Sequence, residues 1–117
     1  MVDLTQYVPV PGDVVWINFD PQTGHEQAGR RPAVVLSPWE YNISSRNLAI
    51  FCPITTRGGN NSFEVVIPEG LDVKDVVLAD QVKSLDWQER NVEFWCSLPH
   101  YTVHEILDKI GVLLQIL

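Results

Sequence analysis

Asp13-Val-Val-Trp-Ile-Asn-Phe19 and Pro32-Ala-Val-Val-Leu-Ser37 are two runs of β-branched and aromatic residues, and they decide the fold. Side chains of these types favour extended strands, and Gly, Pro and Asp bound both runs. A polar, turn-rich loop separates the two runs. The sequence therefore predicts two strands joined by a long loop.

Further runs of the same kind follow at the spacing of short strands in a barrel or sandwich: residues 48–54, 63–67, 76–82 and 92–96. Residues 39–47 indicate a helical turn. Arg57-Gly-Gly-Asn-Asn61 indicates a hairpin loop, because glycine and asparagine tolerate positive φ angles. We therefore expect a mainly β (α+β) protein with about six strands and a single domain over residues 1–117.

The C-terminal segment predicts an amphipathic helix. Thr102-Val-His-Glu105 has the Thr-x-x-Glu form of a capping box. Apolar residues recur at helical spacing and should face the sheet: Val103, Ile106, Leu107, Ile110, Leu113, Leu114 and Leu117. Val112 and Ile116 lie nearly opposite this stripe, which indicates a second contact such as a dimer interface.

Composition is that of an ordinary folded protein, with 45% hydrophobic and 20% charged residues in a chain of 117. No apolar run approaches the roughly 20 residues that span a membrane, and the N-terminal residues lack the basic and apolar regions of a signal peptide. We expect a cytoplasmic protein without a membrane segment. Cys52 and Cys96 stand singly in apolar runs, which predicts buried thiols and neither a metal site nor a cofactor.

Net charge is −7 and is unevenly distributed. Residues 1–24 carry −3, residues 25–62 carry +2 and residues 63–117 carry −6. An acidic body weakens non-specific binding to nucleic acid, but it permits a locally positive groove near residues 25–62. Any nucleic-acid affinity should then depend on salt through only a few contacts.

The loop after the first strand concentrates polar chemistry, since it brings His25, Glu26 and Arg31 close together in the sequence. Its glycines do not have the Gly-x-Gly-x-x-Gly spacing of a dinucleotide site, and no Gly-Lys-Ser/Thr of a Walker loop is present. Two interpretations stay open on residue types alone. The loop is either a solvated segment whose charges pair with one another or part of a catalytic site.

Six separated blocks resemble, in order and spacing, the MazF/PemK/Kid family of toxin ribonucleases: Phe19-Asp-Pro, Gly24-His-Glu-Gln-Ala-Gly, Arg31-Pro-Ala-Val-Val-Leu-Ser37, Pro53-Ile-Thr-Thr56, Phe63-Glu-Val-Val66 and Leu78-Ala-Asp-Gln-Val-Lys-Ser84. The resemblance covers roughly residues 7–117. It implies an SH3-like barrel of six or seven strands, a homodimer, single-stranded RNA as substrate and a cognate antitoxin whose acidic segment covers the RNA groove.

The resemblance also implies roles for individual residues. It puts Arg31 and Thr55 at the catalytic centre, with Glu26, His25 and Asp80 at positions implicated in some members. The Kid branch has a basic residue two positions before its aspartate, and Leu78 stands there in this chain. Arg31 is therefore the residue that we expect to supply the positive charge at the catalytic centre. The matching blocks also supply candidate RNA contacts, which are Gln27, Thr56, Arg57, Gln81 and Lys83.

The expected chemistry needs no metal, because RNA carries its own nucleophile in the 2′-hydroxyl group. Arg31 suits the charge that develops on the phosphorane oxygens, and Thr55 can donate a hydrogen bond to the same phosphate. His25, Glu26 and Asp80 are the candidates for proton transfer, and the sequence does not rank them.

Two alternatives come from other functional classes. A CcdB-like poison of DNA gyrase shares the fold, but the chain ends Leu113-Leu-Gln-Ile-Leu117 without an aromatic anchor. The acidity is also compatible with a non-catalytic module that binds a protein partner. Among the tryptophans, Trp16 is expected in the core, whereas Trp39, Trp87 or Trp95 could stack on a base or anchor an antitoxin segment.

Overall fold

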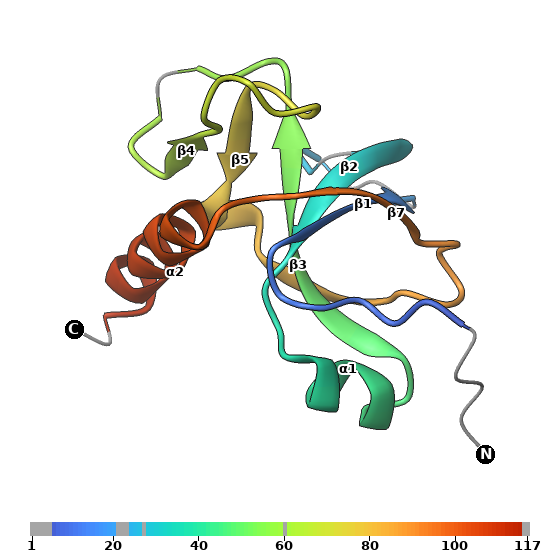
Figure 1. Cartoon of the computed structure of the whole chain (residues 1–117). Coiled ribbons are helices and arrows are strands. Elements are labelled where there is room, and N and C mark those ends of the chain that lie inside the picture. Colours follow the sequence, from blue (N-terminus) through green and yellow to red (C-terminus); the bar gives the residue numbers. More distant parts are fainter. Residues whose placement is uncertain (1–5, 21–23, 27, 60, 116–117) are drawn as a thin grey trace.

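Figure 1 shows the computed structural model of the chain, which describes residues 6–20, 24–26, 28–59 and 61–115. Its elements follow the chain in this order: β1 (Asp13–Asn18), β2 (Arg30–Val35), α1 (Trp39–Ser44), β3 (Leu48–Thr55), β4 (Glu64–Val66), β5 (Val76–Leu78), the 3-10 turn η1 (Ala79–Gln81), β6 (Lys83–Asp86), β7 (Glu93–Ser97) and α2 (His100–Leu114). The mainly β fold with a C-terminal helix is confirmed. No helix in the described part of the chain is long and apolar enough to cross a membrane.

The strands form one seven-stranded antiparallel sheet in the order β4-β5-β3-β2-β1-β7, with β6 also paired to β3. One edge of β3 pairs with two different strands. Leu48 to Phe51 pair with β6, and Ile54 and Thr55 pair with β5. In the ladders of the described residues, β4 and β7 end the path without pairing to each other. The seven strands implied by the resemblance to an SH3-like barrel are thus present, but they form an open sheet that does not close on itself.

The sheet is buried on both faces, as the two-residue period of its strands dictates. Val14, Val34 and Cys52 belong to the core cluster that also holds Val103 and Ile106 of α2. Their sequence neighbours belong to the opposite cluster, which contains Val15, Ala33, Phe51 and Trp87 among others. Neighbouring residues of β1, β2 and β3 thus contribute to different cores.

Two strand predictions need correction. Residues 76–82 do not form one strand, because the chain leaves the sheet at η1 and returns as β6, which sequence reasoning missed. Leu85 is the one buried residue of β6, so the hydrophobic pattern there is weak. The loop through Arg57 does not close a hairpin either, because β5 lies between β3 and β4 in the sheet.

Helix α2 begins at His100 and has Pro99 as its N-cap residue, with no side-chain cap. The predicted capping box is wrong, since Thr102 lies inside the first turn and is buried. Of the predicted stripe, Val103 and Ile106 are buried and Ile110 packs partly against the core, whereas Leu107, Leu113 and Leu114 are exposed. The helix packs on η1 and on the three-residue strand β4, beside which it lies in Figure 1.

Val112 of α2 does not pack on the core, and the second contact that the sequence indicates for it stays a prediction. Val112 is 50% exposed, as expected for a residue opposite the buried stripe. Ile116 and Leu117 lie outside the described residues. Residues 39–47 contain the expected helical turn, which is α1.

Candidate functional site

Strand register brings Arg31 and Thr55 toward each other. Arg31 lies opposite Ile17 on β1, and Ala33 lies opposite Pro53 on β3. Extending the β2–β3 register by two residues on each strand places Arg31 opposite Thr55. Directly opposed residues of antiparallel strands share a face of the sheet. The two residues that the resemblance puts at the centre of the chemistry therefore lie at one end of the same face.

One hollow of about 310 Å³ includes both residues in its wall. The other residues of the wall come from β1, β2, β3, β7 and the segment before β5: Trp16, Pro32, Ile54, Thr56, Asp72, Val73, Lys74, Asp75 and Trp95. The structure therefore brings together Arg31, Thr55 and the candidate RNA contact Thr56.

Hydrogen bonds hold the Arg31 and Thr55 side chains in place. The Nε–H of Arg31 donates to the carbonyl oxygen of Ala28 at 2.7 Å, and this bond engages neither terminal nitrogen of the guanidinium group. Thr55 is 4% exposed, and its Oγ1 accepts a hydrogen bond from the backbone N–H of Arg57 at 3.1 Å. Because Oγ1 is the acceptor there, its own proton is not used in that bond.

Glu26 and Lys83 form an ion pair with 3.5 Å between Oε2 and Nζ. Nζ of Lys83 also lies 5.3 Å from the centre of the Phe19 ring, a cation–π distance. Lys83 pairs with Phe51 of β3 and therefore belongs to the same face of the sheet as Arg31. Glu26 is thus paired with a cation of β6 and not, as the solvated-loop interpretation has it, with a charge of its own loop.

Asp80, His25 and Glu26 do not line the hollow, among the residues that the structure describes. Asp80 is exposed on η1, and His25 is exposed in the loop between β1 and β2. The Asp80 carboxylate lies near Cys52, because its charge, after burial, is the second cause that raises the pKa of the Cys52 thiol to about 12. The three candidates for proton transfer therefore lie outside the wall of the Arg31–Thr55 hollow.

The remaining candidate RNA contacts are dispersed. Arg57 is exposed on the loop after β3, and Gln81 is partly buried on η1. Gln27 lies outside the described residues. A neighbouring hollow of about 440 Å³ shares Thr56 and Asp75 with the first one and also includes Gly58 and Asn61 of the Arg57 loop. The Arg57 loop thus adjoins the Arg31–Thr55 hollow.

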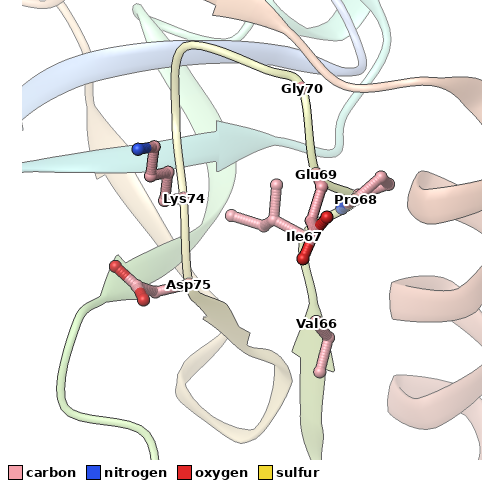
Figure 2. A pocket seen from close by; sticks show the side chains of 7 residues that line it. All are labelled: Val66, Ile67, Pro68, Glu69, Gly70, Lys74 and Asp75. Atoms are coloured by element: carbon pink, nitrogen blue, oxygen red, sulfur yellow. The ribbon is translucent and has the colours of Figure 1, made fainter.

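A third hollow, of about 460 Å³, lies between the segment Val66 to Gly70 and the pair Lys74 and Asp75 (Figure 2). It shares Lys74 and Asp75 with the Arg31–Thr55 hollow. Its wall contains neither Arg31 nor Thr55, so we do not assign the chemistry to it.

Two tryptophans line the hollow, of which sequence reasoning misplaced Trp16 and offered Trp95 only as one of three candidates for base stacking. Trp16, expected in the core, is only partly buried and stacks on Trp95, with 4.9 Å between ring centres and 27° between the ring planes. Trp95 also packs against the core cluster beneath α2. The sequence indicates on which face of the sheet Trp16 lies, because Trp16 follows the same two-residue period as Val14. It does not reveal that the core ends before Trp16.

The cysteines differ from each other. Cys52 is buried as predicted, whereas Cys96 is only partly buried, and burial raises the pKa of both thiols. Within residues 6–20, 24–26, 28–59 and 61–115, no group of three or more His, Cys, Asp and Glu side chains is arranged to hold a metal ion.

Comparison with known proteins gives concordant matches. A family model described as PemK-like, MazF-like toxin of type II toxin–antitoxin system matches residues 10–114. The endoribonuclease toxin MazF of Escherichia coli K12 is 42% identical over 111 residues, which cover 95% of this chain and 98% of that protein. The endoribonuclease PemK of Escherichia coli is 30% identical over 108 residues, which cover 88% of this chain and 80% of that protein.

Solved structures agree. The crystal structure of MazF from Deinococcus radiodurans matches with a TM-score of 0.89 and 48% identity, over 94% of this chain and 99% of that one. A crystal structure of MazE–MazF from the same organism matches with a TM-score of 0.81 and 43% identity, over 93% and 97% of the two chains. The chain therefore belongs to the PemK-like, MazF-like toxins of type II toxin–antitoxin systems.

Proposed function

We propose that this chain is the toxin of a toxin–antitoxin pair and acts as a metal-independent endoribonuclease that cuts single-stranded RNA at a short sequence motif. The observation that carries the proposal is the hollow lined by both Arg31 and Thr55. The relatives named as endoribonucleases support the activity. Membership of this family favours it over a gyrase poison and over a non-catalytic binding module.

The reaction we propose begins when a base removes the proton of the 2′-hydroxyl group. The 2′-oxygen then attacks the adjacent phosphorus, the bond from phosphorus to the 5′-oxygen breaks, and an acid gives that oxygen a proton. The products are a 2′,3′-cyclic phosphate and a 5′-hydroxyl end. His25, Glu26 and Asp80 are the candidates for the acid and base.

Arg31 and Thr55 stabilise charge in this scheme. The bond from Arg31 Nε to Ala28 fixes the side chain and keeps its terminal nitrogens for the phosphorane oxygens. Thr55 keeps a hydroxyl proton with which it can donate to the same phosphate. Thr56, Arg57 and Lys83, with Gln27 and Gln81, are proposed contacts to the rest of the RNA.

The proposal includes the partners of the chain. It acts in the cytoplasm as a homodimer, with residues 1–117 as one domain, and a cognate antitoxin covers its RNA groove. The MazE–MazF structures support an antitoxin partner, since they pair a similar toxin with a second protein.

A substrate test separates this chemistry from other phosphodiester cleavage. The purified chain should cut a long single-stranded RNA at a recurring motif, and a single 2′-deoxynucleotide on the 5′ side of the scissile phosphate should abolish cutting there. A deoxynucleotide one position further away serves as the control and should leave cutting intact. Equal cleavage of both modified substrates would contradict the mechanism, because the attacking oxygen would then not be the 2′-hydroxyl.

A further inference from the structure

We infer that the stacked pair Trp16 and Trp95 binds one nucleobase of the RNA beside the phosphate held at Arg31 and Thr55. This inference rests on the proposed function and adds a recognition site to it. The pair lines the same hollow as Arg31 and Thr55 but from the other side of the strands, since Trp16 shares its face of the sheet with Val14 and Arg31 shares its face with Ala33. A base on the indole surface would therefore belong to a nucleotide next to or near the scissile phosphate.

The arrangement of the two rings favours a planar ligand. The rings are stacked at 4.9 Å with 27° between their planes, and both are only partly buried. Trp95 is anchored against the core cluster beneath α2, which holds the pair rigid. Aromatic side chains with accessible faces bind bases by stacking without regard to base identity.

The charges around the hollow indicate which part of a nucleotide lies where. Asp72 and Asp75 lie in the wall and are exposed, and their carboxylates repel a phosphate group. Arg31 and Lys74 are the cations of the same wall. The phosphate is therefore expected at Arg31, and the uncharged base at the tryptophan pair.

The net charge of the chain explains why base stacking on this pair would contribute to RNA affinity. With a net charge of −7, long-range attraction of RNA is weak. Base stacking contributes affinity that does not depend on releasing counterions. An acidic ribonuclease gains from such a contact more than a basic one would.

Binding and turnover of the full chain test this inference. The probe is a short RNA that contains the motif mapped by cleavage, with one 2′-deoxynucleotide at the cut site so that it stays intact. Trp16→Ala should weaken its binding by about 5- to 150-fold, the range of single base–aromatic stacks. The same variant should raise KM for the cleavable RNA and leave kcat nearly unchanged, and Trp16→Phe should restore most of the affinity.

Trp39→Ala is the matched control. Trp39 is 41% exposed on α1 and is absent from the wall of the hollow. Its loss should leave the dissociation constant unchanged. Abasic substitutions along the RNA, bound to the unmodified chain, provide a second measurement that does not depend on a variant folding. One abasic position should reproduce the loss seen with Trp16→Ala.

The outcomes separate the two proposals. If the chain cuts RNA but Trp16→Ala binds as tightly as the unmodified protein and no abasic position weakens binding, the stacking site is wrong and the ribonuclease stands. If the chain cuts no RNA, the proposed function is wrong and the stacking site falls with it.

Discussion

Glu26 poses the sharpest question at the scale of single residues, because its carboxylate is a candidate base and also the partner of Lys83. The Glu26 side chain is 49% exposed, so solvent screens the pair and its contribution to stability should be below about 1 kcal/mol. If Glu26 is catalytic, its replacement should lower the rate of cleavage. If its role is only the ion pair, the replacement should have little effect on either the rate or the stability.

We expect the residue that acts as base among His25, Glu26 and Asp80, and the one that acts as acid, to matter strongly for the rate. Replacing either of them, as His25→Ala, Glu26→Gln or Asp80→Asn, should lower kcat by about 10² to 10⁴. The urea midpoint of each variant serves as the control, and Glu26→Gln should shift it little. If all three variants retain nearly full activity, none of these residues is the base.

Cys52 and Tyr7 make stability sensitive to alkaline pH. Burial raises the pKa of Cys52 from its usual 9.0 to about 12. Burial and a hydrogen bond to Asp13 raise the pKa of Tyr7 as well. Both groups stay protonated in the folded chain at a pH where the unfolded chain loses these protons. The stability they contribute is complete below pH 9 and falls as pH rises from about 9 toward 12.

Urea titrations at a series of pH values measure this effect. The free energy of unfolding should decline above pH 9, and Cys52→Ala should make the decline shallower even though the smaller side chain lowers stability at every pH. An unchanged slope in that variant would show that Cys52 does not titrate on unfolding in this range.

At the scale of elements, α2 has two unequal halves. Ile106 is fully buried, whereas Leu114 is 62% exposed. Ile106→Ala should lower the free energy of unfolding by about 2 to 5 kcal/mol, because it removes buried methylene groups and leaves a cavity. Leu114→Ala should change it by less than about 0.5 kcal/mol. Urea denaturation of a dilute sample measures both, and similar losses would mean that the second half of α2 is covered.

Runs of β-branched and aromatic residues predicted the strands that are apolar on both faces. β1, β2 and β3 contain alternating residues that enter two different cores, and each was found near its true bounds. β6 was missed because Leu85 is the one buried residue in it. The start of α2 was misplaced because Thr102 and Glu105 match a capping box, while the backbone turns into the helix at Pro99.

The candidate site was predictable only in part, for a similar reason. Arg31 and Thr55 stand in motif blocks, and strand register brings them together. Trp95, Asp72 and Lys74 come from β7 and the segment before β5. Only the folding of β3 against β5 carries that segment to the hollow, and no local pattern in the sequence reports such a contact.

At the scale of the whole molecule, the acidic charge predicts a weak dependence of RNA binding on salt. At most four described cations, Arg31, Arg57, Lys74 and Lys83, belong to the hollow or to the candidate contacts. Each phosphate neutralised on a single strand adds about 0.7 to the slope of log Kd plotted against the logarithm of the salt concentration. Four cations therefore limit this slope to about 3.

Arg57→Ala should reduce that slope by about 0.7, and Arg46→Ala, which removes an exposed arginine outside the candidate contacts, should not change it. Fluorescence anisotropy across a range of salt concentrations gives both values. A slope much steeper than 3 would mean that cations beyond these four contact the RNA.

Cleavage of a long single-stranded RNA in excess EDTA, with the product ends mapped, tests the central claim most directly. The unmodified chain should cut at a short recurring motif and leave 5′-hydroxyl ends. Arg31→Ala should be slower by about 10² or more, while Arg46→Ala, with the same loss of charge, should cut normally. If EDTA abolishes cutting, or if Arg31→Ala cuts as fast as the unmodified chain, the account of a metal-independent ribonuclease centred on Arg31 is contradicted.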